Sequence, residues 1–187
     1  RLKLGLTWLF SYRGIPIVYY GTEIAMPGKN DPYNRDDFPW GKEQNTDVRD
    51  LVTKLNKIRS EHAALRRGKL ENLQADQNTY AFARILGEEK VVTVLNNHAS
   101  EAYTGEVDVS TIGLSDGSKL VDQLSGKSVT VSGGKLKVDL AARSGAIYTQ
   151  APKAPLTYWL VGGLVVVATG FVVGFLLGRR RGRMVKK

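Results

Sequence analysis

The chain has 187 residues, of which 42% are hydrophobic and 24% charged, and it contains no cysteine. These values exclude a disulfide-stabilised miniprotein, a cysteine-based zinc module, a thiol enzyme and a wholly disordered chain. The formal net charge is +9, but residues 179–187 alone hold six of the 27 Lys and Arg residues. Because the rest of the chain is nearly neutral, we expect no nucleic-acid partner.

The first elements are predicted to be a helix and a strand. Residues 1–12 place apolar side chains at helical spacing, and Gly14 follows as a stop signal. Residues 15–20, IPIVYY, are short, apolar and rich in β-forming residues, which predicts a strand buried on both faces. A helix followed by a buried strand is typical of a parallel α/β unit. Since the chain begins with Arg and no signal peptide precedes it, we expect a fragment or processed piece.

A long loop and a second helix come next. Residues 21–46 form the loop, and eight of the chain's sixteen aromatic residues lie within the first 40 positions. Loops of this length are mostly functional or disordered, and the aromatic content favours function. Residues 47–67 carry one apolar stripe and are predicted to form a helix, capped by Thr46 or Asp47 and stopped by Gly68.

From about Leu70 the apolar residues recur with a period of two. Segments such as TYAFARIL, KVVTVLNN and KLKVDL are separated by turns rich in Gly, Asn, Asp and Ser. No helical pattern of any length interrupts them. The sequence therefore predicts a small antiparallel β-sandwich of about 80 residues.

The C-terminal segment has the pattern of a membrane anchor. Residues 158–178 contain no charged residue, and 21 residues at about 1.5 Å each span roughly 30 Å, the thickness of a bilayer core. Tyr158 and Trp159 begin this run, and the basic tail 179–187 follows it. The positive-inside rule then predicts a single-pass protein of the cell membrane, with the body outside and the C-terminus cytoplasmic. The alternative is an apolar helix that docks onto a partner protein instead of lipid.

Two segments carry a family resemblance. Residues 14–40, GIPIVYYGTEIAMPGKNDPYNRDDFPW, resemble the eighth-strand region of the alpha-amylase family of glycoside hydrolases. The branch they are most similar to contains neopullulanases, cyclomaltodextrinases and oligo-glucosidases. Residues 55–70, LNKIRSEHAALRRGKL, resemble the last barrel helix of that family, in which a β-sandwich also follows the barrel. The resemblance covers residues 1–150 and does not include the membrane segment.

The resemblance implies an α/β plus all-β fold: the C-terminal end of a (β/α)8 barrel, with strand 8 and flanking helices, then the antiparallel β-sandwich, then one transmembrane helix. The implied divisions follow in chain order. They are an incomplete barrel end (1–68), a β-sandwich domain (69–150), a linker (151–157), the transmembrane helix (158–178) and a cytoplasmic tail (179–187).

The implied activity is that of a membrane-anchored hydrolase acting on α-glucans such as starch, maltodextrin, cyclodextrin or pullulan. Members of the family cleave α-1,4 or α-1,6 bonds with retention, using two carboxylates assisted by a third. Those carboxylates lie on strands 4, 5 and 7, which all precede Arg1, so we expect no catalytic residue here and no activity of this chain alone. Glu23 is expected to be structural. No cofactor or metal site is expected in this chain, although calcium sites of some relatives lie upstream.

Four residues are the candidate substrate contacts. Asp31 and Arg35 match the Asp and Arg that contact glucose units in the cyclomaltodextrinase-like branch. A carboxylate accepts hydrogen bonds from adjacent sugar hydroxyls, and a guanidinium donates to them. The alternative is that the two bond only to each other. Tyr20 and Trp40 either wall the cleft or belong to the core.

The remaining polar residues are expected to be structural. His62 is expected to be an ordinary helix residue, and His98 shows no partner in the sequence. Two other functions stay open: a non-catalytic amylase-like ectodomain, and a carbohydrate-binding module tethered to the membrane. A homodimer is also left open. The presence or absence of the three carboxylates upstream of Arg1 separates the enzyme from these alternatives.

Overall fold

The computed structural model describes residues 1–43 and 45–151, which form one compact unit. The predicted transmembrane helix (158–178) and the basic tail (179–187) lie outside the described residues, and the linker does so from residue 152 onward. In the part described, no helix has the length and apolar character needed to cross a bilayer.

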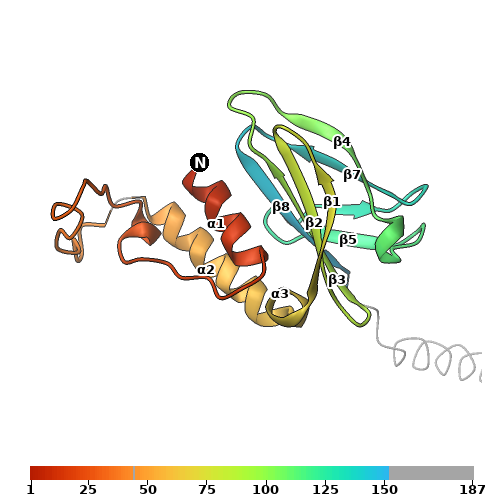
Figure 1. Ribbon diagram of the computed structural model, residues 1–187, viewed down its shortest axis with the longest axis horizontal. Helices are drawn as coiled ribbons and strands as arrows, with labels where there is room; N and C mark the ends of the chain where they lie inside the picture. Colours follow the sequence, from red (N-terminus) through yellow and green to blue (C-terminus); the bar gives the residue numbers. More distant parts are fainter. Residues whose placement is uncertain (44, 152–187) are drawn as a thin grey trace, which may run out of the picture. The chain divides into compact units, whose positions relative to one another are not determined.

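The described helices precede the strands, as Figure 1 shows. The helices are α1 (Leu2–Ser11), α2 (Thr46–Glu61) and α3 (Ala63–Arg67), and the short 3-10 turns are η1 (Thr22–Ile24) and η2 (Ser110–Ile112). The strands are β1 (Lys69–Ala75), β2 (Thr79–Leu86), β3 (Glu89–Asn96), β4 (Tyr103–Asp108), β5 (Lys119–Asp122), β6 (Ser128–Thr130), β7 (Lys135–Leu140) and β8 (Ser144–Gln150).

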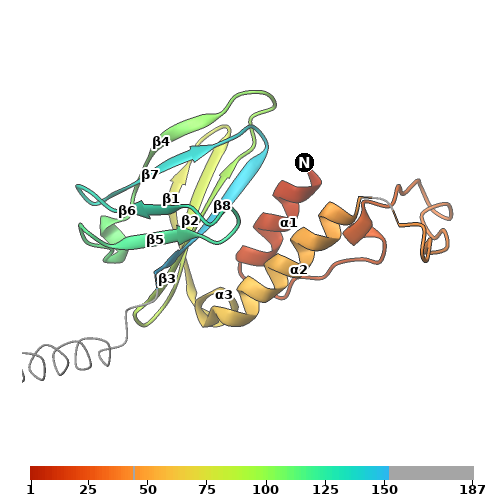
Figure 2. The same ribbon diagram turned by 180° about the vertical axis from the view of Figure 1, so that it is seen from behind.

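The strands form two antiparallel sheets. The larger has the order β1-β2-β3-β8-β5-β6, and the smaller consists of β4 and β7. The two sheets lie face to face, and Figure 2 shows the same arrangement from behind. This confirms the antiparallel β-sandwich that the alternating pattern predicts.

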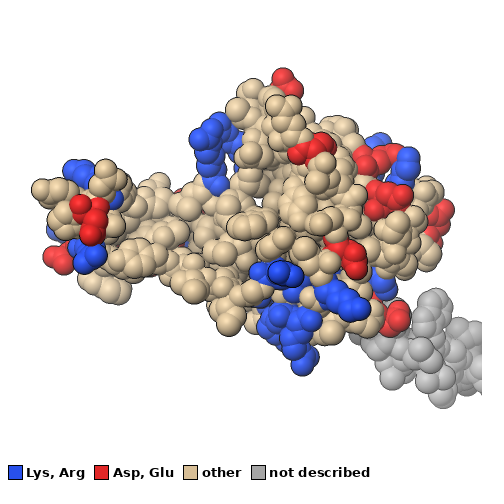
Figure 3. Space-filling model, viewed as in Figure 1, with Lys and Arg blue, Asp and Glu red and all other residues tan. Residues whose placement is uncertain are grey.

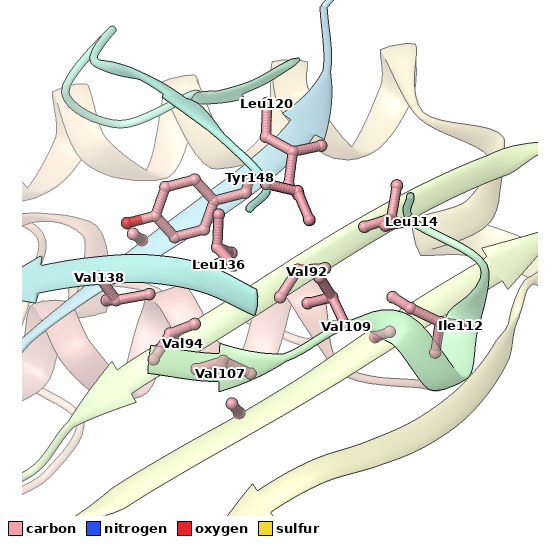
Figure 4. Packing of buried hydrophobic residues seen from close by; sticks show 14 of the residues in the cluster. Val92, Val94, Val107, Val109, Ile112, Leu114, Leu120, Leu136, Val138 and Tyr148 are labelled. Atoms are coloured by element: carbon pink, nitrogen blue, oxygen red, sulfur yellow. The ribbon is translucent and has the colours of Figure 1, made fainter. Parts of the chain in front are cut away.

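The central strands of the larger sheet are buried on both faces. Their inner face packs against the smaller sheet and forms the sandwich core shown in Figure 4, which includes Ala83, Val92, Val94, Leu136, Val138 and Tyr148. Alternate residues point the other way, where Val91 and Ile147 pack against Leu6 of α1 and Leu55 of α2. Burial on both faces explains why KVVTV is a continuous apolar run and not an alternating one.

The predicted helix over 47–67 is interrupted at His62, which has an extended backbone. The carboxylate of Glu89 accepts a hydrogen bond from the backbone N–H of Ala64 at 2.8 Å, and one of its oxygens lies 2.9 Å from His62 Nδ1. This carboxylate satisfies a free N–H at the start of α3, so a second short helix begins there. The predicted caps are wrong: Asn45 is the N-cap of α2, with no side-chain cap bond, and Asp47 pairs with Lys3.

Two buried arginines hold the end of α1. Arg59 of α2 donates to the carbonyl oxygens of Phe10 at 2.7 Å and Gly14 at 2.5 Å. Arg84 of β2 donates to those of Ser11 at 3.2 Å and Gly68 at 3.0 Å. The carbonyls at a helix C-terminus carry partial negative charge, which favours cations there. Burial lowers the pKa of both guanidinium groups, and each is lowered further by a neighbouring arginine.

The prediction of a buried strand over 15–20 is wrong for this chain taken alone. These residues are in no strand, and the side chains of Ile15 and Ile17 are 88% and 82% exposed. A strand needs a neighbour to accept its backbone hydrogen bonds, and neither described sheet supplies one. Of this segment, Val18 alone packs partly against the core between α1, α2 and the larger sheet.

Candidate functional site

The aromatic loop, residues 21–43, is fixed where it begins and just after it ends. Gly21 has a φ of +83°, and a Cβ there would lie 2.9 Å from the side chain of Met26, so only glycine fits this turn. The turn η1 follows and buries Ile24. Asn45 Nδ2, beyond the loop, donates to the Ile24 carbonyl oxygen at 3.3 Å. These contacts hold both ends of the loop against the helical layer.

The base of the aromatic loop encloses a pocket of about 390 Å³. Its lining includes the apolar residues Met26 and Pro27 together with the charged residues Asp36, Asp37 and Lys42. Figure 3 shows acidic and basic side chains close together on this loop, at the left of the view. Two carboxylates and an ammonium beside an apolar wall provide the acceptors and donors that a polyhydroxylated ligand requires.

Asp31 and Arg35 bond to each other. The Arg35 Nη2 to Asp31 Oδ1 distance is 3.1 Å, and the two side chains are 65% and 67% exposed. This ion pair is the contact expected under the alternative in which the two residues bond to each other and rigidify the loop. An ion pair this exposed contributes at most about 1 kcal/mol. Both side chains therefore remain open to a ligand, because exchanging this bond for others costs little.

Tyr20 and Trp40 are both exposed in this chain, so neither belongs to the core that the described residues form. The Tyr20 hydroxyl donates to the Asp36 carbonyl oxygen at 3.0 Å, which ties the start of the loop to its far side. Partial desolvation raises the pKa of Tyr20, and Tyr19 and Asp36 raise it further. Trp40 is 81% exposed, and its ring lies 4.5 Å from that of Phe38. An exposed indole of this kind is a surface on which a sugar ring can stack.

None of the four predicted residues lines the pocket itself. The structure brings Asp31 to Arg35 and Tyr20 to the backbone of Asp36, but it does not join these pairs or Trp40 into one cluster. The pocket residues Asp36, Asp37 and Lys42 were missed by sequence reasoning. The signal that points to the first two is the Asp-Asp pair directly after Arg35, at the far side of a loop rich in aromatics.

The structure gives the two remaining polar residues, Glu23 and His98, different surroundings. Glu23 Oε2 is buried without a hydrogen-bond partner among the described residues. His98 does have partners, against expectation: its Nδ1 accepts from the Glu101 N–H at 2.8 Å, and its Nε2 lies 3.6 Å from the Glu101 carboxylate. Over residues 1–43 and 45–151, no group of three His, Asp or Glu side chains is placed to hold a metal ion.

Comparison with known proteins identifies the sandwich. Residues 70–149 match the family described as "Neopullulanase-like, C-terminal domain". They form a neopullulanase-like C-terminal domain of the alpha-amylase family. The resemblance seen in the sequence is confirmed for this domain. The chain is 36% identical over 156 residues to the amylopullulanase of Thermoanaerobacter thermohydrosulfuricus. The aligned residues cover 79% of this chain and 10% of the relative.

Two further similarities agree with this assignment. Neopullulanase 2 of Thermoactinomyces vulgaris is 35% identical over 150 residues, with 79% of this chain and 25% of the relative aligned. A crystal structure of an Anoxybacillus alpha-amylase has 39% identity and a TM-score of 0.73, covering 83% of this chain and 33% of that one. The chain thus spans a quarter or less of these two curated relatives and a third of the solved structure.

Proposed function

We propose that this chain is the C-terminal part of a glycoside hydrolase that cleaves α-1,4 or α-1,6 bonds of α-glucans by a retaining mechanism. The observation that carries the proposal is the aromatic loop, with its sugar-type donors and acceptors, joined to a neopullulanase-like C-terminal domain. Retaining hydrolysis requires two carboxylates about 5 Å apart. We place both on a barrel that precedes Arg1, and assign this chain the binding of substrate and none of the chemistry.

The proposed barrel accounts for the exposed segment. Residues 1–68 supply its last strand and flanking helices, and residues 69–150 the sandwich. Ile15 and Ile17 are exposed here and would be covered by neighbouring strands of a complete barrel. The barrel's active site lies at the C-terminal ends of its strands. The aromatic loop follows residues 15–20 directly, so Asp31, Arg35, Tyr20 and Trp40 would stand at the rim of the cleft.

We assign Asp31 and Arg35 to contacts with the sugar, and not only to contact with each other. Their present bond is exposed and weak, whereas hydrogen bonds from sugar hydroxyls to a carboxylate in a partly closed cleft are worth about 1.5–3 kcal/mol each. Trp40 would supply a flat apolar face for a pyranose ring. The pairing seen here then describes the loop without substrate.

The same proposal includes anchoring in the cell membrane by residues 158–178, with the body outside and the tail 179–187 in the cytoplasm. Its support is the uncharged length of 21 residues, with aromatic residues before it and six basic residues after it. A linker at residues 151–157 would separate the sandwich from the lipid.

The test uses the chain extended by the coding region upstream of Arg1. We expect it to release reducing sugars from maltodextrin or pullulan. Activity should sediment with membranes and become soluble when residues 158–187 are deleted. Asp31→Ala should lower kcat/KM by about 10- to 100-fold without changing stability, because a charged hydrogen bond to substrate is lost.

The matched control is Lys57→Ala, which removes a similarly exposed ion pair with Glu61 on α2, away from the loop. It should leave kcat/KM unchanged. Full activity of both Asp31→Ala and Trp40→Ala would show that the aromatic loop does not contact substrate. An extended chain that binds maltodextrin without hydrolysing it would instead favour the non-catalytic alternative.

A further inference from the structure

Basic side chains gather where α3 meets the end of α1 and the start of β1. This arginine patch consists of Arg13, Arg59, Arg66, Arg67, Lys69 and Arg84. Arg59 and Arg84 form its buried base, and the other four residues are exposed. Arg84 Nη2 donates at 3.0 Å to the carbonyl oxygen of Gly68, the residue before Lys69. At the lower centre of Figure 3, basic side chains are seen together around α3.

The guanidinium groups of the patch lie close enough to act on one another. Arg66 Nη1 donates to the carbonyl oxygen of Arg59 at 2.8 Å. Burial lowers the pKa of Arg59, and the positive charge of Arg66 lowers it further. Burial also lowers the pKa of Arg84, and Arg59 and Arg13 add to this effect. Like charges that disfavour one another in this way concentrate positive potential at one place on the protein.

The patch lacks a counter-ion of its own. In the part of the chain that the structure describes, none of its side chains forms an ion pair with a carboxylate. Glu61 and Glu88 lie 3.8 and 3.9 Å from lysines outside the patch, and Glu89 accepts from α3 as described above. Glu71 of β1 sets one negative charge against the six positive ones. Such a surface favours a partner that brings several negative charges together.

The patch lies at the end of the larger sheet from which the chain leaves the sandwich. Lys69 pairs with Ile85, and Ile85 pairs with Lys90. The backbone N–H of Lys90 donates at 3.1 Å to the side chain of Gln150, the last residue of β8. Three strand spacings therefore separate Lys69 from Gln150, or about 14 Å. The linker that follows, 151–157, has a reach of at most about 25 Å, so a membrane anchor after it would hold this end of the sheet near the lipid.

The aromatic loop lies away from the patch. The loop is followed by α2, whose 16 residues span about 24 Å, and α3 comes directly after α2. Figure 1 shows the aromatic loop beyond one end of α2 and α3 at the other end. A surface that contacted the patch would therefore leave the loop uncovered.

We propose that the arginine patch binds the anionic headgroups of the bilayer in which residues 158–178 are anchored. The membrane location rests on the proposed function. A phospholipid surface presents many phosphates in one plane, and each basic residue close to an anionic surface strengthens binding by about five-fold. With α3 on the lipid, the aromatic loop is directed away from the bilayer and stays open to a polymeric glucan.

The experiment reconstitutes the full 187-residue chain into lipid vesicles. Because the chain has no cysteine, Ser60→Cys gives a single site for a fluorophore beside the patch, where the Ser60 carbonyl oxygen accepts from Arg66. A spin-labelled lipid headgroup quenches the fluorophore when the patch lies on the bilayer. We expect strong quenching in vesicles of equal parts phosphatidylcholine and phosphatidylglycerol, and weak quenching in phosphatidylcholine alone. High salt should remove the difference, because it screens exposed charges.

The variant that tests the patch combines Arg67→Gln with Lys69→Gln. At about five-fold for each charge, it should lower the ratio of docked to undocked chain by roughly 25-fold. The matched control combines Lys127→Gln with Lys137→Gln, which removes the same charge from exposed lysines of the sandwich outside the patch. It should leave the quenching unchanged.

A second label position checks the orientation. Ser100→Cys lies in the turn after β3, at the opposite end of that strand from Lys90, and its fluorophore should stay unquenched. Equal quenching at residues 60 and 100 would overturn the proposal. So would quenching at residue 60 that does not depend on phosphatidylglycerol or on Arg67 and Lys69.

Flotation of the same vesicles separates the patch from the membrane anchor. A chain that floats with phosphatidylcholine alone is anchored, and its quenching then tests the patch. A chain that floats only with phosphatidylglycerol, and fails to do so in the Arg67 and Lys69 double variant, supports the patch and contradicts the anchor. Flotation with neither lipid contradicts both. Loss of hydrolysis by the extended chain would leave each of these results unchanged.

Discussion

The sandwich and the segment 15–20 are both built from short apolar runs, yet their side chains end in opposite environments. Val92 and Val94 of β3 are completely buried, whereas Ile15 and Ile17 are more than four-fifths exposed. Both pairs belong to runs that favour a buried strand. The difference lies in the partners: β3 has β2 and β8 on either side, and residues 15–20 have no strand beside them. Apolar sequence specifies a strand only when the chain also provides its neighbours.

The largest change in stability is expected when one side chain is replaced in each region. Leu136→Ala should lower the free energy of unfolding by about 2–5 kcal/mol, because Leu136 is fully buried in the sandwich core. Ile17→Ala should change it by no more than about 0.5 kcal/mol, since the side chain already faces solvent. Urea denaturation of the full chain measures both values.

The same two substitutions, made in the chain extended upstream of Arg1, test whether residues 15–20 are a barrel strand. If strands upstream of Arg1 cover Ile17, the cost of Ile17→Ala should rise towards that of Leu136→Ala. A cost that stays near zero would mean that residues 15–20 are not a barrel strand.

A smaller effect is expected where the sandwich meets the end of α1. Arg84→Met should lower the free energy of unfolding by about 2–3 kcal/mol, because it leaves the carbonyls of Ser11 and Gly68 without their donor. Arg67→Met, at an exposed arginine that ends α3, is the control and should be nearly neutral. Thermal unfolding followed by circular dichroism compares them. Equal losses would show that the guanidinium of Arg84 does not stabilise the junction.

The smallest effect concerns alkaline pH and lies entirely within the sandwich. An unfolded tyrosine ionises near pH 10, whereas the folded Tyr148 has a pKa of about 12. The unfolded state therefore loses this proton first. The contribution to stability is complete below pH 10 and falls as the pH rises to 12, by on the order of 2 kcal/mol. Urea titrations across this range should show a shallower loss in Tyr148→Phe. Identical pH profiles would contradict the burial of the phenol.

Local patterns predicted most of the sandwich. KLKVDL alternates with a period of two, and the strand β7 occupies those six residues. The helix after the loop was also predicted, but its break at His62 was not, because that break depends on Glu89, a residue 27 positions away. Long-range partners of this kind are invisible to any local window.

The candidate sites show the same limit. Asp31 and Arg35 were found through a motif, and their spacing of four already allows the ion pair that forms. The pocket residues Asp36, Asp37 and Lys42 were not foreseen, because only the fold of the aromatic loop brings them beside Met26 and Pro27.

The arginines that hold α1 limit how this protein can be divided. The chain passes from helix to sandwich at Gly68. The guanidinium of Arg84, sixteen residues later, nevertheless donates to the carbonyl oxygen of Ser11 in α1. A sandwich transplanted from residue 69 onward would carry a guanidinium on an otherwise apolar sheet face with its acceptors removed. A segment that keeps these hydrogen bonds must therefore begin before α1, even though the strands begin after it.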